Sequence, residues 1–189
     1  MLFHKKGEAA DPANYRPIAL HLTIYKLWTS IITQVLQDYA EEVGMLNRAQ
    51  EGFRKFRNCA RQLQLLTRTI EDAKSSRRNL FLLKVDFSSA FKSIDHTRLF
   101  AVMRKLGYPE DAVKVVVDLY TNATTSITTS AGQSDTVRIQ RGTIQGDTLS
   151  PFLFLLVMEP PLRWLEVGNR GYRCGIMPAT VQLVLNALG

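Results

Sequence analysis

Residues 80–87, Leu-Phe-Leu-Leu-Lys-Val-Asp-Phe, form a nearly continuous apolar run that closes on a carboxylate. Apolar side chains at both odd and even positions are typical of a central strand that is buried on both faces of a sheet. Such a strand needs covering layers, and helical patterns elsewhere in the chain can provide them. The combination predicts an α+β domain.

The first helical pattern covers residues 23–43 and is followed by Gly44. Its apolar side chains recur at i, i+3, i+4 and i+7, which predicts an amphipathic helix that ends at this glycine. The apolar stripe comprises Ile24, Leu27, Trp28, Ile31, Ile32, Val35, Leu36 and Tyr39.

Local capping signals predict the starts of three further helices between residues 58 and 111. Asn58 can cap a helix that runs to about residue 74, and its inner face is expected to carry Leu63, Leu66 and Ile70. Asp95 or Thr97 can cap a short helix that ends at Gly107. The sequence Pro109-Glu110-Asp111 is expected to start another helix, with acids at its positive end.

The last third of the chain predicts a hairpin and one long helix. Two β-prone runs, 124–130 and 136–140, flank Ala-Gly-Gln-Ser-Asp and indicate the hairpin. Residues 149–165 predict a largely buried helix, which Pro160 and Pro161 are expected to break or kink.

Charge is unevenly distributed along the chain. The formal net charge is +7, and residues 48–78 hold nine Lys or Arg against three acids. This basic segment suits contact with a phosphate backbone, and a solvated basic helix face explains it equally well. Cys59 and Cys174 show no metal-binding spacing, and no apolar run is long enough to cross a bilayer. An intracellular chain is expected, in the nucleus or the cytoplasm.

The stretch 141–151, Arg-Gly-Thr-Ile-Gln-Gly-Asp-Thr-Leu-Ser-Pro, is the most specific in the chain. Glycine lets backbone approach a ligand closely, and a loop that leads into a helix presents free N–H groups to phosphate or ribose. A strand-end carboxylate such as Asp86 beside such a loop indicates a metal–nucleotide site. Taken alone, a strand-end Asp more often caps a turn.

These two segments together resemble the reverse transcriptase of non-LTR (LINE-type) retrotransposons. Residues 14–20, Asn-Tyr-Arg-Pro-Ile-Ala-Leu, and residues 50–55, Gln-Glu-Gly-Phe-Arg-Lys, carry the same resemblance in the family's order. The resemblance implies a retrotransposon RNA-directed DNA polymerase, a nucleotidyltransferase that acts on an RNA template, a DNA primer and a dNTP.

The resemblance also implies a partial right-hand polymerase. A fingers-like region would cover residues 1–78, an incomplete palm residues 79–175, and a divergent tail residues 176–189. The catalytic Asp-Asp hairpin and the thumb of the family pattern are lacking from this arrangement.

Site residues follow from the resemblance position by position. Asp86 and the Phe87 carbonyl match ligands of Mg²⁺, or Mn²⁺, in the two-metal transfer reaction. Phe91 matches a steric gate whose ring would clash with a 2′-hydroxyl, although a core aromatic is the competing interpretation. The residues matched to the incoming nucleotide are Lys6, Arg16, Ser89, Ala90, Phe91, Gln145 and Gly146. Those matched to the template are Gln50, Gly52, Phe53 and Arg54.

Structural roles compete at several of these positions. Lys5 fits the family's lysine as well as Lys6 does, and both suit a solvated terminus. Core packing competes with base stacking for Phe53. Asp147 is expected at the start of a helix rather than on a metal, and capping is favoured for the Asp95-His96 pair.

The chain departs from the family pattern after Asp147. No aspartate follows it, and the later acids are Glu159 and Glu166. One carboxylate does not hold two divalent cations against their desolvation and mutual repulsion. The isolated chain is therefore expected to be an inactive fragment, and the alternative is a non-catalytic nucleic-acid-binding remnant or pseudogene product. The Asp86 strand is expected to keep an unpaired edge and an exposed apolar face, and the oligomeric state is left open.

Overall fold

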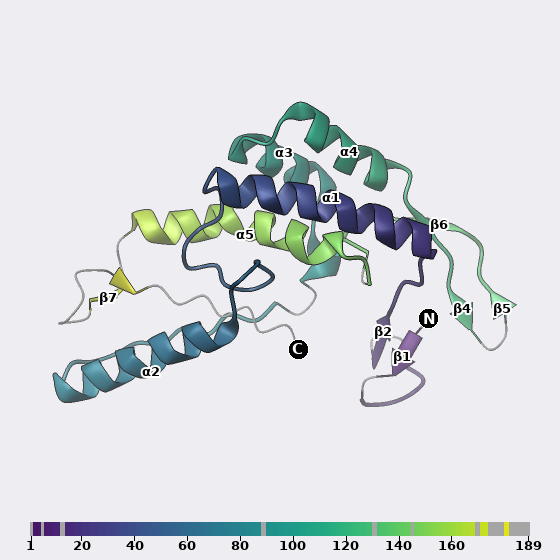
Figure 1. Ribbon diagram of the computed structural model, residues 1–189. Coiled ribbons are helices and arrows are strands. Elements are labelled where there is room, and N and C mark those ends of the chain that lie inside the picture. Colours follow the sequence, from purple (N-terminus) through teal and green to yellow (C-terminus); the bar gives the residue numbers. More distant parts are fainter. Residues whose placement is uncertain are drawn as a thin grey trace. The chain divides into compact units, whose positions relative to one another are not determined.

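The computed structural model describes residues 2–4, 6–11, 14–87, 90–129, 132–144, 146–168, 171–173 and 180–181. Helices dominate this part of the chain (Figure 1). They are α1 (Thr23–Glu42), α2 (Cys59–Ser75), α3 (His96–Leu106), α4 (Glu110–Thr121), α5 (Leu149–Val167) and the short 3₁₀ helix η2 (Phe91–Ser93).

The described strands are short and form antiparallel pairs. The pairs are β1 (Leu2–His4) with β2 (Tyr15–Pro17), β3 (Thr124–Thr125) with β6 (Val137–Arg138), β4 (Thr128–Thr129) with β5 (Gly132–Gln133), and β7 (Tyr172–Arg173) with β8 (Thr180–Val181). The nested pairs β3–β6 and β4–β5 confirm the predicted hairpin, although β5 lies within the five residues that were predicted as its turn. Helices with small sheets agree with the predicted mixed α and β class.

The chain divides into two compact units that are interleaved along the sequence. Unit 1 comprises residues 1–38 and 89–154, and unit 2 comprises residues 39–88 and 155–189. The helices α1 and α5 each begin in unit 1 and end in unit 2. The fingers, palm and tail boundaries predicted from the family resemblance stay predictions.

Capping residues start and end the helices where the sequence predicts. Asn58 accepts a hydrogen bond from Arg61 N, and Asp95 accepts one from Arg98 N at 2.9 Å. Gly107 ends α3 with a left-handed backbone at φ +100°. Pro109 lies at the N-cap of α4, one position earlier than a first-turn proline, with Glu110 at the start of the helix.

The core of unit 1 is helical. Two α4 valines are fully buried, and the Tyr108 hydroxyl, just after α3, donates to Leu36 O of α1 at 2.9 Å. Fully buried side chains from the three helices α3, α4 and α5 are Leu99, Met103, Val113, Val116, Leu149 and Leu153. This packing supports the segments that carry the candidate site.

Residues 80–87 do not form the predicted strand. They have no regular secondary structure, and none of the strand pairs in the described residues includes them. Phe81 is 92% exposed and its neighbour Leu82 is 59% exposed, so apolar side chains at both odd and even positions of the run meet solvent. A strand of this composition needs hydrogen-bonding neighbours and covering layers, and the described part of the chain supplies neither. The exposed apolar side chains agree with the expected exposed face, whereas the unpaired strand edge stays a prediction, because no strand is formed here.

Two predicted helix faces also differ from the observed ones. On α1, Ile32 and Leu36 are buried, but other members of the apolar stripe are exposed. On α2, Leu63 is 54% exposed, because Gln62, Thr69 and Ala73 form the buried face instead. The inner face of α2 is thus rotated by one residue from the predicted one.

The predicted break at Pro160 and Pro161 is wrong, because α5 continues through both to Val167, whereas the alternative of a kink stays a prediction. The two rings are exposed, while the flanking Glu159 and Leu162 are buried. Burial of these neighbours outweighs a cost of about 3 kcal/mol per interior proline. Among the described helices, none is both long enough and apolar enough to cross a membrane.

Candidate active site

The stretch 141–151 is fixed against the turn that begins at Ala90. Thr143 N donates to Phe91 O at 2.8 Å, and Gly142 N donates to Ile94 O at 2.7 Å. His96 Nε2 lies 2.8 Å from Gly142 O, and because a carbonyl can only accept, Nε2 carries the proton. Three hydrogen bonds therefore join two segments that the resemblance assigns to one site.

Gly142 leaves no room for a side chain in this junction. Its φ is +84°, and a Cβ built there would lie 2.8 Å from Lys92 Cα and 3.0 Å from Phe91 O. Because both neighbours are backbone atoms, they cannot move aside as a flexible side chain could. The glycine is required by close approach as well as by its backbone conformation.

Gly146 brings the same stretch against the segment that follows β2. Its φ is +110°, and a Cβ there would lie 2.9 Å from Ala19 O. The backbone of Arg16 belongs to β2, where it pairs with Phe3. Unit 1 therefore places the Gly146 turn beside the residues that directly follow the predicted triphosphate-binding strand.

Phe91 lies at the junction of these segments and is half-buried. Its ring packs against Phe154 with centroids 5.6 Å apart and an interplanar angle of 57°. Ala90 is also half-buried, and its carbonyl accepts a hydrogen bond from the Ser93 hydroxyl at 2.9 Å. One side of the Phe91 ring thus belongs to the core while part of it stays accessible, so gate and core roles are compatible.

A buried polar cluster supports the Gly146 turn from behind. Asp147 is buried at the start of α5, where its Oδ1 accepts from Leu149 N at 3.4 Å. The Ser150 hydroxyl donates to Ile144 O at 2.7 Å, and the Thr29 and Thr148 hydroxyls lie 3.2 Å apart. These bonds confirm Asp147 as a helix N-terminal residue, as the sequence predicts.

The same cluster perturbs nearby titratable groups. Burial raises the pKa of Tyr25 to about 12, and the negative charge of Asp147 adds to the effect. Burial also raises the pKa of Tyr120. The pKa of His21 is lowered by burial and by Lys26, although Asp147 opposes the shift. Both tyrosines and the histidine are therefore neutral at pH 7.

Asp86 and Phe87 belong to unit 2, at the end of the apolar run 80–87. Both residues are exposed. One carboxylate and one carbonyl are suitable hard oxygen donors for Mg²⁺. Within the described residues no group of three or more His, Cys, Asp or Glu side chains could hold a metal ion. Within the described part of the chain, the donors therefore do not complete a two-ion site.

For the other residues predicted to contact the nucleotide, the structure gives only part of the surroundings or none. Lys6 is exposed, and Arg16 contributes its backbone to β2. Ser89 and Gln145 lie outside the described residues. Their matched roles stay predictions.

The predicted template segment forms a loop held by Arg54. Its guanidinium donates to both carboxylate oxygens of Glu41, at 2.6 and 2.8 Å, and to the carbonyl oxygens of Asn47 and Gln50. The Arg54 side chain is only 5% exposed, and Gln50 is fully buried. These two side chains shape the loop, whereas Gly52 and the exposed Phe53 lie nearer to solvent.

Glu159 anchors the same loop and carried no predicted role. Its fully buried carboxylate accepts from Asn47 N with both oxygens at 3.0 Å, and Arg163 Nε lies 3.6 Å away. Burial raises the pKa of Glu159, although the Asn47 N–H and Arg163 oppose the shift. Glu159 follows Phe152 by seven residues and Leu155 by four, a helical spacing that could have revealed its inward position.

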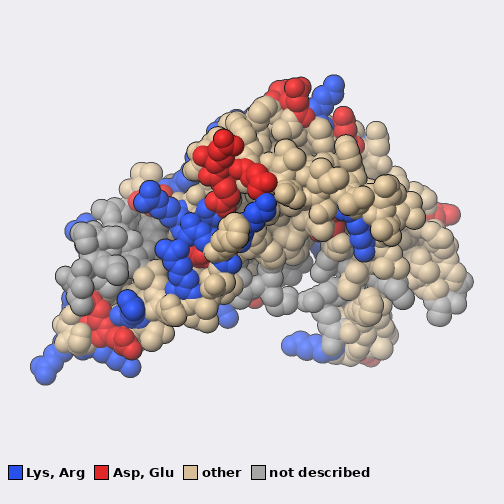
Figure 2. Space-filling model, viewed as in Figure 1, with Lys and Arg blue, Asp and Glu red and all other residues tan. Residues whose placement is uncertain are grey.

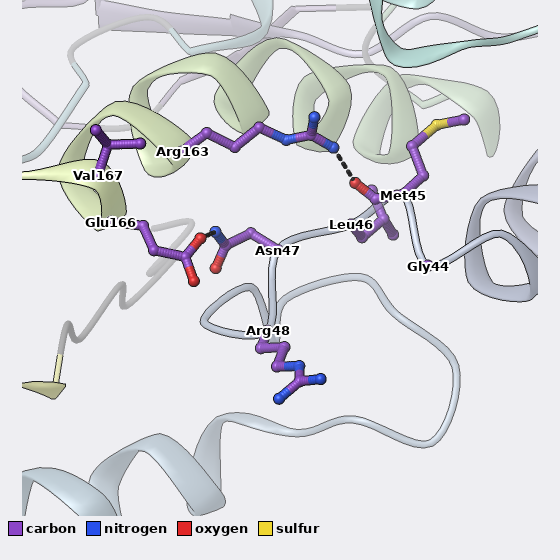
Figure 3. A pocket seen from close by; sticks show the side chains of 8 residues that line it. All are labelled: Gly44, Met45, Leu46, Asn47, Arg48, Arg163, Glu166 and Val167. Atoms are coloured by element: carbon purple, nitrogen blue, oxygen red, sulfur yellow. Dashed lines mark hydrogen bonds between the residues drawn. The ribbon is translucent and has the colours of Figure 1, made fainter. Parts of the chain in front are cut away.

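A shallow pocket of about 470 Å³ opens where this loop meets α5 (Figure 3). The Arg163 guanidinium donates to Met45 O at 2.6 Å, and the Asn47 side chain donates to Glu166 at 2.8 Å. Arg48 points away from α5 in the same view. The polar groups nearest α5 are thus hydrogen-bonded to one another. The pocket is therefore explained by the hydrogen bonds that hold residues 44–48 against α5.

Comparison with known proteins supports the resemblance over nearly the whole chain. The family model for "Reverse transcriptase (RNA-dependent DNA polymerase)" matches residues 3–177. The Pol polyprotein of the type-1 retrotransposable element R2 from Popillia japonica is 28% identical over 87% of this chain. The corresponding R2 protein from Nasonia vitripennis is 27% identical over 93% of this chain.

A third relative is the Pol polyprotein of the type-2 element R2DM from Drosophila melanogaster, 28% identical over 88% of this chain. The matched region is a small part of each relative. It spans 23% of the Popillia protein, 17% of the Nasonia protein and 16% of the Drosophila protein.

Proposed function

The chain belongs to the reverse transcriptase family, and from this premise we propose that it forms the nucleotide-handling part of an RNA-directed DNA polymerase. The contact between the Gly146 turn and the segment after β2 carries the proposal. It brings together residues 14–20 and residues 141–151, two separate stretches of the family pattern, in unit 1. Hydrogen bonds also connect the second stretch to the turn at Phe91.

In the proposed reaction a primer 3′-hydroxyl attacks the α-phosphate of a dNTP, and pyrophosphate leaves. Arg16 would bind the triphosphate through paired N–H groups, with Lys6 as an additional positive charge. Gly146 would let the sugar approach the backbone, because no Cβ intervenes. Phe91 would exclude a 2′-hydroxyl and so favour dNTP over NTP.

A divalent cation, Mg²⁺ or Mn²⁺, would neutralise charge on the phosphates when bound. Asp86 and the Phe87 carbonyl are the oxygen donors that this chain offers to one ion. The remaining ligands would have to come from substrate phosphates and from a further carboxylate. We therefore propose that the 189-residue polypeptide binds nucleotide but does not extend a primer by itself.

The RNA template and the DNA primer are the proposed macromolecular partners. Phe53 would stack on a base beside Gly52, while Arg54 and Gln50 keep the loop in shape. Figure 2 shows Lys and Arg side chains gathered where Figure 1 places α2 and the loop before it. This basic segment would contact phosphates, and its binding should weaken steeply as salt rises.

Nucleotide binding by the intact chain tests the proposal directly. Fluorescent dATP and ATP analogues would be titrated in Mg²⁺ into the wild type, Phe91→Ala and Phe100→Ala. Phe100 is a half-buried phenylalanine of unit 1 outside the proposed site, so it controls for general loss of packing. We expect a preference for dATP that Phe91→Ala reduces about tenfold, on the order of 1.4 kcal/mol, and that Phe100→Ala preserves.

A wild-type chain that binds neither analogue would overturn the nucleotide site, and one that binds both equally would overturn the steric gate at Phe91. Primer extension on an RNA template supplies the second arm. Extension that Asp86→Ala abolishes would contradict the requirement for a further carboxylate. Salt-dependent RNA binding without nucleotide binding would favour the non-catalytic nucleic-acid-binding alternative.

A further inference from the structure

The exposed face of α1 carries a regular apolar seam. Ile24, Trp28, Ile31 and Val35 follow one another at intervals of four, three and four residues, and Leu27 flanks them. All five side chains are 51–69% exposed, while the opposite face of α1 buries Ile32 and Leu36. Figure 2 shows a mostly uncharged surface in the region that α1 occupies in Figure 1. The helix therefore has two apolar faces, and unit 1 covers one of them.

The spacing of the seam specifies the kind of partner. Alternating steps of three and four residues are the pattern by which one helix packs along another in a two-stranded coiled coil. A helix that packs at the shallow crossing angle of such pairs would cover all four seam positions. The seam thus fits a second helix rather than a sheet or a flat surface.

We propose that the partner is a second copy of this chain, with the two α1 helices antiparallel. The four-three-four spacing is the same from either end. A two-fold axis between Trp28 and Ile31 would therefore set Ile24 of one copy opposite Val35 of the other, and each Trp28 opposite an Ile31. Such self-complementarity is what an isologous dimer requires.

The charges of α1 agree with an antiparallel pair. Lys26 is the basic residue of the helix, and its acids, Asp38, Glu41 and Glu42, lie toward the other end. Antiparallel packing keeps the acidic ends of the two helices apart and opposes the two helix dipoles. An excess of acids makes this helix a poor ligand for nucleic acid or an anionic membrane.

The area is sufficient for reversible association. The five side chains of one copy expose on the order of 500 Å² of apolar surface. In a stable complex each partner typically buries about 800 Å², polar and apolar surface together. The polar residues that border the seam would supply the remainder. We expect a weak, reversible dimer with roughly micromolar affinity. It is independent of the polymerase proposal because no nucleotide-site residue contributes.

Sedimentation velocity from about 1 to 100 μM would test the dimer, since this interval brackets micromolar affinity. The wild type should pass from monomer to dimer, and Trp28→Lys or Ile31→Lys should raise the dissociation constant at least about tenfold. Leu83→Lys is the matched control, because Leu83 is more exposed than any seam residue yet lies in unit 2. It should leave the dimer intact, and circular dichroism would verify folding of each variant.

Fluorescence supplies an independent measurement. In a Trp164→Phe background Trp28 is the remaining tryptophan, and its emission should shift to the blue as concentration rises. A wild type that stays monomeric at the highest concentration would overturn the proposal. Equal dissociation by Leu83→Lys and Trp28→Lys would also overturn it, because it would show unspecific apolar association. Larger oligomers would contradict the closed two-fold arrangement.

Discussion

Two apolar stretches with family motifs behave differently in this molecule. Residues 149–154 begin α5 within unit 1, where Leu149, Phe152 and Leu153 are buried. The glycine-rich turn before them is hydrogen-bonded to the segment that starts at Phe91 and lies close to Ala19. Residues 80–87 are equally apolar, yet their side chains are exposed. The difference lies in partners, because a helix satisfies its own backbone whereas a strand depends on neighbours. A family motif alone therefore does not guarantee that its residues are packed against the rest of the protein.

The same substitution in both stretches measures this difference most directly. Leu153→Ala removes a fully buried side chain and should lower the free energy of unfolding by about 2–5 kcal/mol. Leu83→Ala should change it by less than about 0.5 kcal/mol, because Leu83 already meets solvent. Urea denaturation followed by circular dichroism would compare the two. Equal losses would show that the 80–87 run is packed in solution.

Locally encoded features were predictable from the sequence. The caps at Asn58 and Asp95 and the left-handed end of α3 at Gly107 depend on a few adjacent residues, and all three are confirmed. The hairpin formed by the strands within residues 124–129 and 132–138 needed only a local hairpin signal. In each case short-range hydrogen bonding decides the structure.

Features that depend on distant residues were not predictable in the same way. The run 80–87 has strand composition, but its pairing depends on segments elsewhere in the chain. The α1 stripe combined two apolar faces, and periodicity alone could not tell which one is covered. At the candidate site, Asp86, Gly146 and Phe91 were found from motif resemblance, whereas the loop anchor Glu159 stood unnoticed in an apolar helix.

Gly142→Ala should destabilise unit 1 through a steric clash rather than through a cavity. The added Cβ would meet backbone atoms of Lys92 and Phe91 and would occupy a φ of +84°. We expect a loss of roughly 2–4 kcal/mol in the free energy of unfolding. Gly107→Ala is the control, since its φ is +100° but no atom lies within 4 Å of the built Cβ. Its loss should be about 1–2 kcal/mol, and a loss equal to that of Gly142→Ala would rule out the clash.

Unit 2 should show two opposite pH dependences from two glutamates that hold its loop. Burial raises the pKa of Glu159 above 4.5 in the folded chain, so the unfolded chain releases its proton first and stability falls as pH rises from 4.5 to the raised pKa. The Arg54 hydrogen bonds lower the pKa of Glu41, so its contribution is present above 4.5 and is lost as pH falls through the lowered pKa.

Urea midpoints measured across this range would separate the two groups. Glu159→Gln should remove the decline above pH 4.5, and Glu41→Gln should reduce the decline on the acid side. Each variant serves as the control for the other, because both lie in unit 2 and fasten the same loop. A Glu159→Gln profile parallel to that of the wild type would contradict a buried, proton-retaining carboxylate.

Phe56→Gly should produce the smallest effect, and in the opposite direction. Phe56 has a φ of +58° and its side chain is fully exposed, so the residue bears left-handed strain without a packing gain. Glycine adopts this backbone readily, and relief of about 1–2 kcal/mol should exceed the 0.5–1 kcal/mol entropic cost of glycine. A net gain of about 0.5–1 kcal/mol is expected by urea denaturation.

Phe81→Gly is the matched control for that gain. Phe81 is 92% exposed, like Phe56, but it is not among the described non-glycine residues with positive φ. Its replacement should leave stability unchanged or slightly lower it, because glycine adds entropy to the unfolded chain without relieving strain. Stabilisation by Phe56→Gly alone would locate the strain in the 47–58 loop. Equal stabilisation by both would instead show that exposed phenylalanines are unfavourable wherever they lie in unit 2.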